Sequence, residues 1–338
     1  MGSKHLFPVM ATVCLALMPI SSAWAANKYS ARDITPAGAF MCHANGINAS
    51  GQVVGDYFLD TAYQVVRGFV TGPNGRRPIL VGTLGGDKSG LSDINDDGVA
   101  VGYATTVNNL SQSAIMVPTG SNAAVDVGVA GWTTASASYI NNKGWILGSG
   151  LLPDQSWRSF FIAPGTGMTT LEPYTTPGEI TEDGVIVGGT QSAPFMTGPN
   201  GSGMTVLGSL GGSAGWASGI NKKKEVVGFS QTANGLSYHA FVTDPGGLNM
   251  RDVGVPGDFV MAKRINNKGT IVGIYSSTWA DPQRAFVADR LGRYSDLSIL
   301  TNLGSNRFLS DASALNDDGQ IVATSNDWRC YLLTPADR

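Results

Sequence analysis

Charged residues are scarce in this sequence: Asp, Glu, Lys and Arg together make up 14% of its 338 residues, whereas about 25% is usual. Only 22 residues are Lys or Arg, and the formal net charge is −3. Binding to nucleic acid depends on a basic patch that neutralises phosphates. The composition therefore excludes a general nucleic-acid binder, and we expect no nucleic-acid partner.

Residues with metal-binding or nucleophilic chemistry are equally few, since the sequence holds three His and three Cys. Their separations do not give the ligand spacing of a zinc site. A short acidic run from Asp93 to Gly98 begins like a calcium loop, but it lacks the alternating ligands and the distant Glu. No Gly-x-Ser-x-Gly nucleophile motif is present. We predict no metal site and no cofactor.

The sequence also lacks a hydrophobic run long enough to span a bilayer, which takes about 20 residues. Its longest apolar run, residues 6–20, contains two prolines and follows a basic residue. Ala23 and Ala25 then supply the small residues of a secretory cleavage site. We predict a cleaved signal peptide over residues 1–25 and a secreted or periplasmic mature chain, residues 26–338, without a retained membrane span. A retained anchor is the alternative.

Glycine, in contrast, is abundant, with 45 residues, and many of these glycines belong to an internal repeat. The repeated motif is apolar-Asn-x-x-Gly-x-apolar-apolar-Gly, first seen as residues 47–55, and its copies are 47, 46, 40, 40, 45 and 50 residues apart. We number these repeats one to seven. They begin at Ile47, Ile94, Ile140, Ile180, Ile220, Ile265 and Leu315. A period of 40–50 residues is typical of a β-propeller blade.

Each repeat predicts four short strands. The Asn-x-x-Gly segment is a turn, because Asn favours its first position and Gly allows the positive φ at its end. The flanking runs are short and β-branched, as in strands. Six repeats supply a fourth strand, whereas the seventh stops after its third, and residues 31–35 match the missing strand. We therefore predict an all-β, seven-bladed β-propeller with four antiparallel strands per blade, its last blade completed by the N-terminal strand. Residues 26–338 would form this single domain, as a monomer.

This topology predicts two faces. The Asn turn and the turn between strands three and four lie on what we call the short-turn face. The loops between strands two and three, and between successive repeats, lie on the long-loop face, where we expect connections of about 8–12 residues. Cys14 leaves with the signal peptide, and ring closure would bring Cys42 and Cys330 together on the long-loop face as a disulfide. Two unrelated buried thiols are the alternative.

The repeats also resemble the HAF-repeat family of exported bacterial proteins, named for a His-Ala-Phe tripeptide that stands here as residues 239–241. Residues 207–212, Leu-Gly-Ser-Leu-Gly-Gly, and residues 81–86, Val-Gly-Thr-Leu-Gly-Gly, are similar to that family's repeat. The resemblance covers nearly the whole mature chain, and only one copy keeps the full tripeptide. It implies an extracytoplasmic location and brings no established reaction or catalytic residues.

Five tryptophans map to the predicted long-loop face, where exposed rings would offer flat apolar area to a sugar or a protein partner. The alternative is that the rings fill crevices between blades. The five are Trp132, Trp157, Trp216, Trp279 and Trp328. They predict an exported binding or interaction module whose ligand is a polysaccharide or a cell-surface partner.

A polysaccharide lyase or hydrolase with its site on the same face is the alternative function. His239 with Tyr238 could abstract a proton beside a uronic-acid carboxylate that Arg264 neutralises. His43 is the other mature histidine, in repeat one, far from His239 around a seven-membered ring. The plainer interpretation of His239 is a hydrogen bond within its own blade, and the sequence shows no complete catalytic constellation.

Overall fold

The computed structural model describes residues 29–62 and 64–336. The predicted signal peptide and Cys14 lie outside the described residues. Almost all regular structure is β-strand, and the helices of the described part are three-residue 3-10 turns: η1 (Pro73–Gly75), η2 (Val107–Asn109) and η3 (Pro199–Gly201). None of these described turns approaches the length and apolarity that crossing a bilayer requires.

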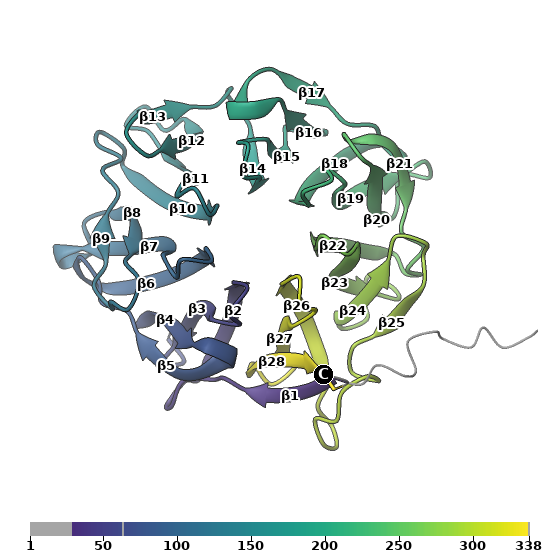
Figure 1. Cartoon of the computed structure of the whole chain (residues 1–338), viewed down its shortest axis with the longest axis horizontal. Helices are drawn as coiled ribbons and strands as arrows, with labels where there is room; N and C mark the ends of the chain where they lie inside the picture. Colours follow the sequence, from purple (N-terminus) through teal and green to yellow (C-terminus); the bar gives the residue numbers. More distant parts are fainter. Residues whose placement is uncertain (1–28, 63, 337–338) are drawn as a thin grey trace, which may run out of the picture.

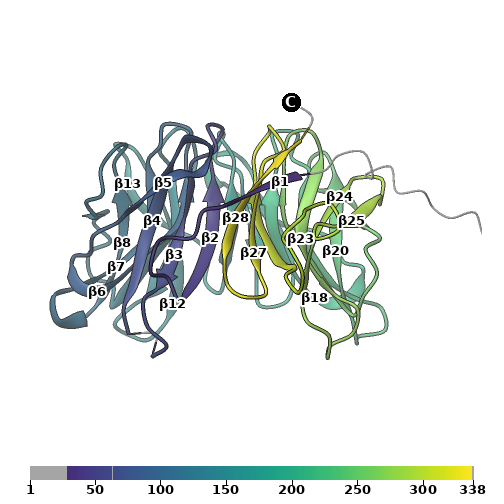
Figure 2. The same cartoon turned by 90° about the horizontal axis from the view of Figure 1, so that it is seen from below.

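Each sequence repeat forms an antiparallel group of strands that pair in chain order, and the groups surround a common centre with their first strands innermost (Figure 1). Repeats one to three contain β2 (Met41–Ile47), β3 (Val53–Phe58), β4 (Val66–Gly72), β5 (Arg76–Leu80); β6 (Gly85–Ile94), β7 (Ala100–Thr106), β8 (Gln112–Val117), β9 (Val125–Asp126); β10 (Thr134–Ile140), β11 (Ile146–Leu151), β12 (Trp157–Ala163) and β13 (Gly167–Thr170). Repeats four to six contain β14 (Thr176–Ile180), β15 (Ile186–Gly189), β16 (Pro194–Thr197), β17 (Met204–Val206); β18 (Gly211–Ile220), β19 (Val226–Thr232), β20 (Tyr238–Asp244), β21 (Leu248–Asp252); β22 (Phe259–Ile265), β23 (Thr270–Ser276), β24 (Arg284–Asp289) and β25 (Tyr294–Asp296). The strands run between the two faces of the ring (Figure 2).

Repeat seven contains β26 (Leu309–Leu315), β27 (Ile321–Ser325) and β28 (Cys330–Pro335), and the N-terminal strand β1 (Tyr29–Asp33) pairs antiparallel with β28. The first and last strands therefore belong to one sheet. β1 begins two residues earlier than the strand predicted over residues 31–35. The predicted disulfide is also confirmed: Cys42 and Cys330, 288 residues apart, are bonded with their Cα atoms 5.7 Å apart. It joins β2 of repeat one to β28 of repeat seven.

Glycines of the second strands let each first strand approach closely. A Cβ added at Gly55 would lie 2.0 Å from the carbonyl oxygen of His43, and one at Gly228 would lie 1.9 Å from that of Trp216. No side chain larger than hydrogen fits there. Buried Phe side chains of the third strands pack beside these positions, among them Phe69 and Phe241. The apolar residues of neighbouring sheets then form the core between repeats.

The repeated Asn does more than begin a turn. Its side-chain oxygen accepts backbone N–H groups of its own turn, as Asn266 does from Lys268 (3.1 Å) and Thr270 (2.9 Å). Its amide then donates to the Asn carbonyl of the next repeat, for example Asn316 to Asn48 at 3.1 Å. The same link runs from the Asn of repeats one, two, three, five and six at 2.9–3.2 Å, and in repeat three its acceptor is the carbonyl of Thr181. Repeat four has Thr181 instead, which carries no amide, so this belt of bonds has one gap.

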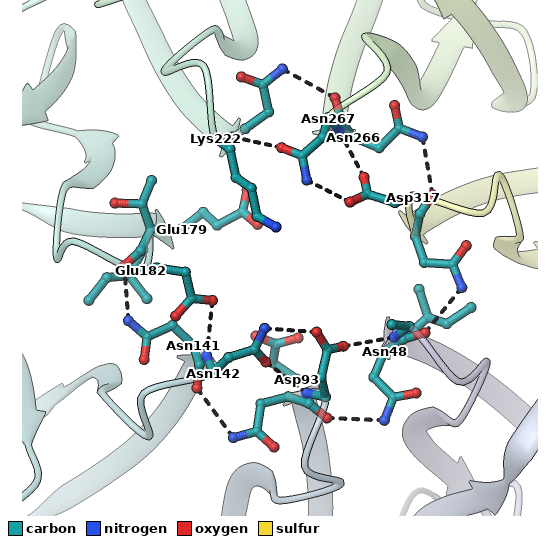
Figure 3. A pocket seen from close by; sticks show the side chains of 18 of the residues that line it. Asn48, Asp93, Asn141, Asn142, Glu179, Glu182, Lys222, Asn266, Asn267 and Asp317 are labelled. Carbon is teal, nitrogen blue, oxygen red and sulfur yellow. Dashed lines mark hydrogen bonds between the residues drawn. The ribbon is translucent and has the colours of Figure 1, made fainter.

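A second belt lies beside the first on the short-turn face (Figure 3). The residue after each Asn uses its side-chain oxygen to accept the N–H of the corresponding residue in the preceding repeat. Ala49 donates in this way to Asp96, Asp96 to Asn142, Asn142 to Glu182, Lys222 to Asn267, and Asn267 to Asp317, at 2.8–3.1 Å. Lys222 and Ala49 cannot accept such a bond, so this belt is broken at repeats five and one.

The long-loop face differs from the expectation in loop length. The first strands β6 and β18 extend through glycine-rich segments that the sequence predicts to be loops, because Gly85 pairs with β7 and Gly211 pairs with β19. Most connections on this face are consequently shorter than the expected 8–12 residues, and the segment 297–308 is the long exception.

Candidate functional site

A pocket of about 430 Å³ opens on the long-loop face between repeats seven and one. Its walls come from three places: the start of β26 with Phe308 and Asp311, the turn before β28 with Trp328, and β2 with His43. Gln283, from the connection between β23 and β24, borders it from repeat six. The pocket therefore brings together two residues that the sequence singles out separately, His43 and Trp328.

Trp328 is held in an unusual backbone conformation. Its φ is +61°, in the left-handed region that a bulky residue seldom adopts. The turn that imposes this conformation is closed by a hydrogen bond from the N–H of Trp328 to the carbonyl of Ser325 at 2.9 Å. The indole lies edge-to-face with His43, centroids 5.6 Å apart, yet remains 47% exposed. A large, flat apolar surface is thus displayed at the pocket.

His43 is fixed by its neighbours. Its Nδ1 lies 3.2 Å from a carboxylate oxygen of Asp56, and the amide of Asn45 donates to the other oxygen at 3.0 Å. The hydrogen bond with Asp56 raises the pKa of His43, and burial opposes that shift. His43 is therefore protonated more readily than a free histidine, and its protonated form makes an ion pair with Asp56.

Asp311 is paired as well. Both of its carboxylate oxygens accept from the ammonium of Lys263, at 2.7 and 2.8 Å. Nearby, Arg307 and Asp327 form a bidentate pair with a shortest distance of 2.6 Å. The ionic groups around the pocket are consequently neutralised within the protein.

A second aromatic group lies on the same face, over repeats five and six. Trp279 is 57% exposed, with its centroid 5.4 Å from Phe259 and 6.2 Å from Tyr238. The indole N–H donates to the carbonyl of Leu236 at 3.2 Å. These contacts hold the ring on the surface. Trp157, at the start of β12, is 47% exposed.

Trp132 and Trp216 do not fit the predicted role. Trp216 lies within β18 rather than in a loop, because that strand is longer than expected, and its half-buried ring packs against Gly189 of repeat four. Trp132 does lie in a connection between repeats, but its half-buried ring meets Phe160 edge-on at 5.4 Å. Both rings fill space between strands, which is the alternative that the sequence leaves open.

The residues of the lyase hypothesis are not brought together. His239 lies at the start of β20 with its Nδ1 2.6 Å from Asp252 of the neighbouring strand β21. Arg264 lies near the opposite end of β22, five residues beyond Phe259, the residue that is level with Tyr238. At a rise of about 3.3 Å per residue, Arg264 lies roughly 16 Å from the level of Tyr238 along the strands. His239 thus bonds within its own repeat, and His43 lies in repeat one.

The short-turn face carries a second cavity, at the centre of the ring (Figure 3). Its volume is about 240 Å³, and its lining comes from the Asn turns of all seven repeats. Asp93 and Glu179 line it, and each accepts a backbone N–H from the next repeat, Ile140 at 3.0 Å and Ile220 at 2.8 Å. The sequence reasoning considers Asp93 only as the start of a calcium-like run and gives neither carboxylate a role at the centre.

These carboxylates belong to a charged group with Arg264 and Tyr139. Burial raises the pKa of Asp93 to about 6 and that of Glu179 to about 7, although Arg264 favours their ionised forms. Burial alone would lower the pKa of Arg264, but interactions with Tyr139, Glu179 and Asp93 outweigh it. The guanidinium lies 5.0 Å from the Tyr139 ring centroid and donates to the carbonyl of Ser218 at 3.2 Å. All four groups lie away from the long-loop pocket.

A signal for this group exists in the sequence. Asp93, Tyr139, Glu179 and Arg264 occupy the same repeat position, immediately before the apolar residue of the motif, where repeats one and five have glycine. Aligning the repeats at this position brings two acidic residues and one basic residue to the centre, where they can interact. Within the described residues, no group of three or more His, Cys, Asp or Glu side chains is placed to hold a metal ion.

No protein-family model matches this chain, and no curated protein sequence does. Solved structures do match. The chain is similar to the β-propeller domain of the Trilobed protease from Pyrococcus furiosus, with a TM-score of 0.57 and 8% identity over 88% of this chain and 96% of that one. It is similar to YCF48 from Cyanidioschyzon merolae, with a TM-score of 0.56 and 8% identity over 90% of this chain and 98% of that one.

A third similar structure is Pyrococcus horikoshii acylaminoacyl peptidase, with a TM-score of 0.54 and 8% identity. This match covers 87% of the present chain but 50% of the peptidase. At such identities the likeness concerns the fold alone. The chain is a β-propeller.

Proposed function

We propose that this chain is an exported, seven-bladed β-propeller that binds a cell-surface ligand on its long-loop face. The pairing of β1 with β28 and the bond from Asn316 to Asn48 support a ring of seven blades closed by the N-terminal strand. The disulfide between Cys42 and Cys330 supports export, because such bonds persist mainly in oxidising compartments. The resemblance to HAF-repeat proteins agrees with that location.

The observation that carries the proposed binding role is the pocket beside Trp328. It combines a volume within the roughly 300–1,000 Å³ of small-ligand sites with an indole that is 47% exposed. Backbone strain at a bulky residue is retained where the surrounding structure and function require it. Trp328 combines a strained backbone with an exposed indole at a pocket of suitable volume, which makes it the residue most directly linked to binding.

Binding is favoured over catalysis by the placement of the titratable groups. The proton abstraction considered above needs His239 and Arg264 at one ligand, and they occupy different ends of their strands. In the pocket itself, His43 is already paired with Asp56. This contact through Nδ1 leaves the other ring nitrogen able to act as a base. The other titratable residue of the lining, Asp311, is bound by Lys263, so the pocket offers His43 no second free acid or base.

The test is co-sedimentation of the mature chain with insoluble polysaccharides and with bacterial envelope fractions, followed by assays for new reducing ends and unsaturated products. Trp328→Gly is the binding variant, since glycine accepts a positive φ. Trp157→Ala is the matched control, because Trp157 has the same exposed fraction, 47%, in repeat three.

We expect retention on at least one of these materials, at least a tenfold loss in Trp328→Gly, and full retention in Trp157→Ala. Retention that survives Trp328→Gly, or that is absent from every material, contradicts the proposal. Cleavage of a bound polymer would replace the binding role by the enzymatic alternative.

A further inference from the structure

The charge balance of the long-loop pocket restricts what it can bind. The two titratable residues that line it are each bound to a group within the protein, His43 to the carboxylate of Asp56 and Asp311 to the ammonium of Lys263. An anionic ligand would have to break the bidentate Lys263–Asp311 pair to find a cation, and a cationic ligand would have to break one pair or the other for a carboxylate. Buried or half-buried pairs resist such exchange. The pocket is therefore matched to an uncharged ligand.

The hydrogen-bonding groups of the pocket point the same way. Gln283 is exposed at the rim, and its side-chain amide makes no hydrogen bond to protein within the described part of the chain. An amide offers both a donor and an acceptor, which suits hydroxyl groups. Ser310, Ser325 and Asn326 add further neutral polar side chains to the wall.

The Phe and Trp rings of the pocket differ in exposure: Phe308 is half-buried, whereas Trp328 is 47% exposed. The guanidinium of Arg284 covers Phe308, 4.7 Å from its ring centroid, and is itself paired with Asp296. Trp328 makes a T-shaped contact with His43, and no cation is placed over its ring in the described part of the chain. Its indole is thus available for flat stacking against an apolar surface of a ligand.

The turn that holds Trp328 recurs in other repeats, without tryptophan. Gln155 in repeat three and Gly235 in repeat five also have positive φ and close their turns with the same N–H to carbonyl bond, at 3.0 and 2.9 Å. The turn therefore forms without an aromatic residue. Tryptophan at this position adds strain and no contact that closes the turn.

We propose that the pocket binds an uncharged sugar residue, stacked on Trp328 and hydrogen-bonded by Gln283, and that it discriminates against acidic sugars. This inference rests on the proposed binding role of the long-loop face and names its ligand class. A pyranose ring has an apolar C–H face and a rim of hydroxyl groups, which correspond to the indole and to the amide.

The experiment uses the mature chain and defined probes: neutral gluco-, galacto- and manno-oligosaccharides, and uronic-acid oligomers from pectin and alginate. Affinities are measured by calorimetry for the wild type, Trp328→Gly, Gln283→Ala and the control Trp157→Ala, at low and high NaCl. We expect at least one neutral oligosaccharide to bind with little salt dependence, with a tenfold or greater loss in Trp328→Gly and a several-fold loss in Gln283→Ala. The midpoint temperature of thermal unfolding of Trp328→Gly should be equal to or higher than that of the wild type.

Three results would overturn the sugar class. Tighter, salt-dependent binding of uronic-acid oligomers that still needs Trp328 leaves the proposed function standing but makes the ligand acidic. Failure of every oligosaccharide, together with Trp328-dependent retention on an envelope protein, makes the ligand a protein. Binding unaffected by Trp328→Gly removes both the sugar class and the pocket.

Discussion

The gap at Thr181 allows a paired test of the belt of Asn side chains on the short-turn face. Asn266→Ala removes a complete link of that belt, whereas Thr181→Asn should supply the missing one. Thr181 already accepts the N–H of Val185 at 3.0 Å through its hydroxyl. An Asn there could keep that bond and donate its amide to the carbonyl of Asn221, as the other copies do to their neighbours.

The expected magnitudes follow from the bonds involved. Asn266, 5% exposed, makes three side-chain hydrogen bonds: it accepts from Lys268 and Thr270 and donates to the carbonyl of Asn316. At about 1 kcal/mol each, Asn266→Ala should lower the free energy of unfolding by about 3 kcal/mol. Thr181→Asn adds a buried bond and removes the exposed one that the Thr181 hydroxyl donates to Asp183 at 2.6 Å, so it should raise the free energy of unfolding by up to about 1 kcal/mol.

Equilibrium urea unfolding followed by fluorescence and circular dichroism measures both changes, provided that the two probes coincide. Asn122→Ala is the matched control, because Asn122 is exposed and makes no side-chain hydrogen bond in the described part of the chain. A loss below about 1 kcal/mol in Asn266→Ala, or no gain in Thr181→Asn, would refute the account of the belt.

Three further variants test the charged group, the disulfide and the half-buried Trp216. Glu179→Gln should raise the free energy of unfolding at pH 8 but hardly at pH 4.5, since a folded pKa of about 7 means that stability present below the unfolded pKa is lost as pH rises. The size of the pKa shift limits this gain to about 3 kcal/mol, and solvent screening in the cavity should reduce it to about 1–2 kcal/mol. Urea unfolding at both pH values measures the gain. An equal gain at pH 4.5 and pH 8 would be contrary to the assignment. Reducing the bond between Cys42 and Cys330 should cost roughly 2–5 kcal/mol, whereas dithiothreitol should leave a Cys42→Ala/Cys330→Ala variant unchanged; a wild type indifferent to reductant would contradict this. Trp216→Ala should destabilise the fold by about 3–5 kcal/mol in thermal or urea unfolding without a specific loss of ligand; a fully stable variant would mean that the ring is not a packing element.

Local sequence was sufficient to predict much of the fold. The motif beginning at Ile47 contains its own turn chemistry and strand pattern, so each repeat could be interpreted without its neighbours. The N-terminal strand could be placed because repeat seven lacks a fourth strand, and the cysteine pair followed from that placement. These features depend on residues adjacent in sequence or on the order of the repeats.

Other features depend on contacts between repeats, and the sequence did not reveal them. The segment around Trp216 contains several glycines, which indicated a loop, but pairing with β19 extends it into a strand. Exposure of a tryptophan is likewise set by its neighbours: Trp132 meets Phe160, whereas Trp328 is held outward by its turn. Trp328 and His43, far apart in the sequence, share a pocket only because the ends of the chain meet.

The charged group at the centre illustrates the same limit. In the sequence, Asp93 only begins a calcium-like run and Glu179 only precedes a turn, and neither position indicates burial. Their raised pKa values result from burial at the centre of the ring, which the packing of all the repeats creates. Aligning the repeats by position, rather than by motif alone, would have identified them.

The central claim is that a ligand binds against Trp328 on the long-loop face, and fluorine NMR of the mature chain labelled with 5-fluorotryptophan tests it most directly. The seven tryptophans of the sequence include Trp24 of the predicted signal peptide, and Trp328→Gly identifies the resonance of interest by its loss. We predict that titration with the neutral oligosaccharides shifts the Trp328 resonance while that of Trp157 stays in place. A Trp328 resonance that stays unmoved with every material the chain retains, acidic oligomers and envelope fractions included, or a shift confined to other tryptophans, would contradict the account.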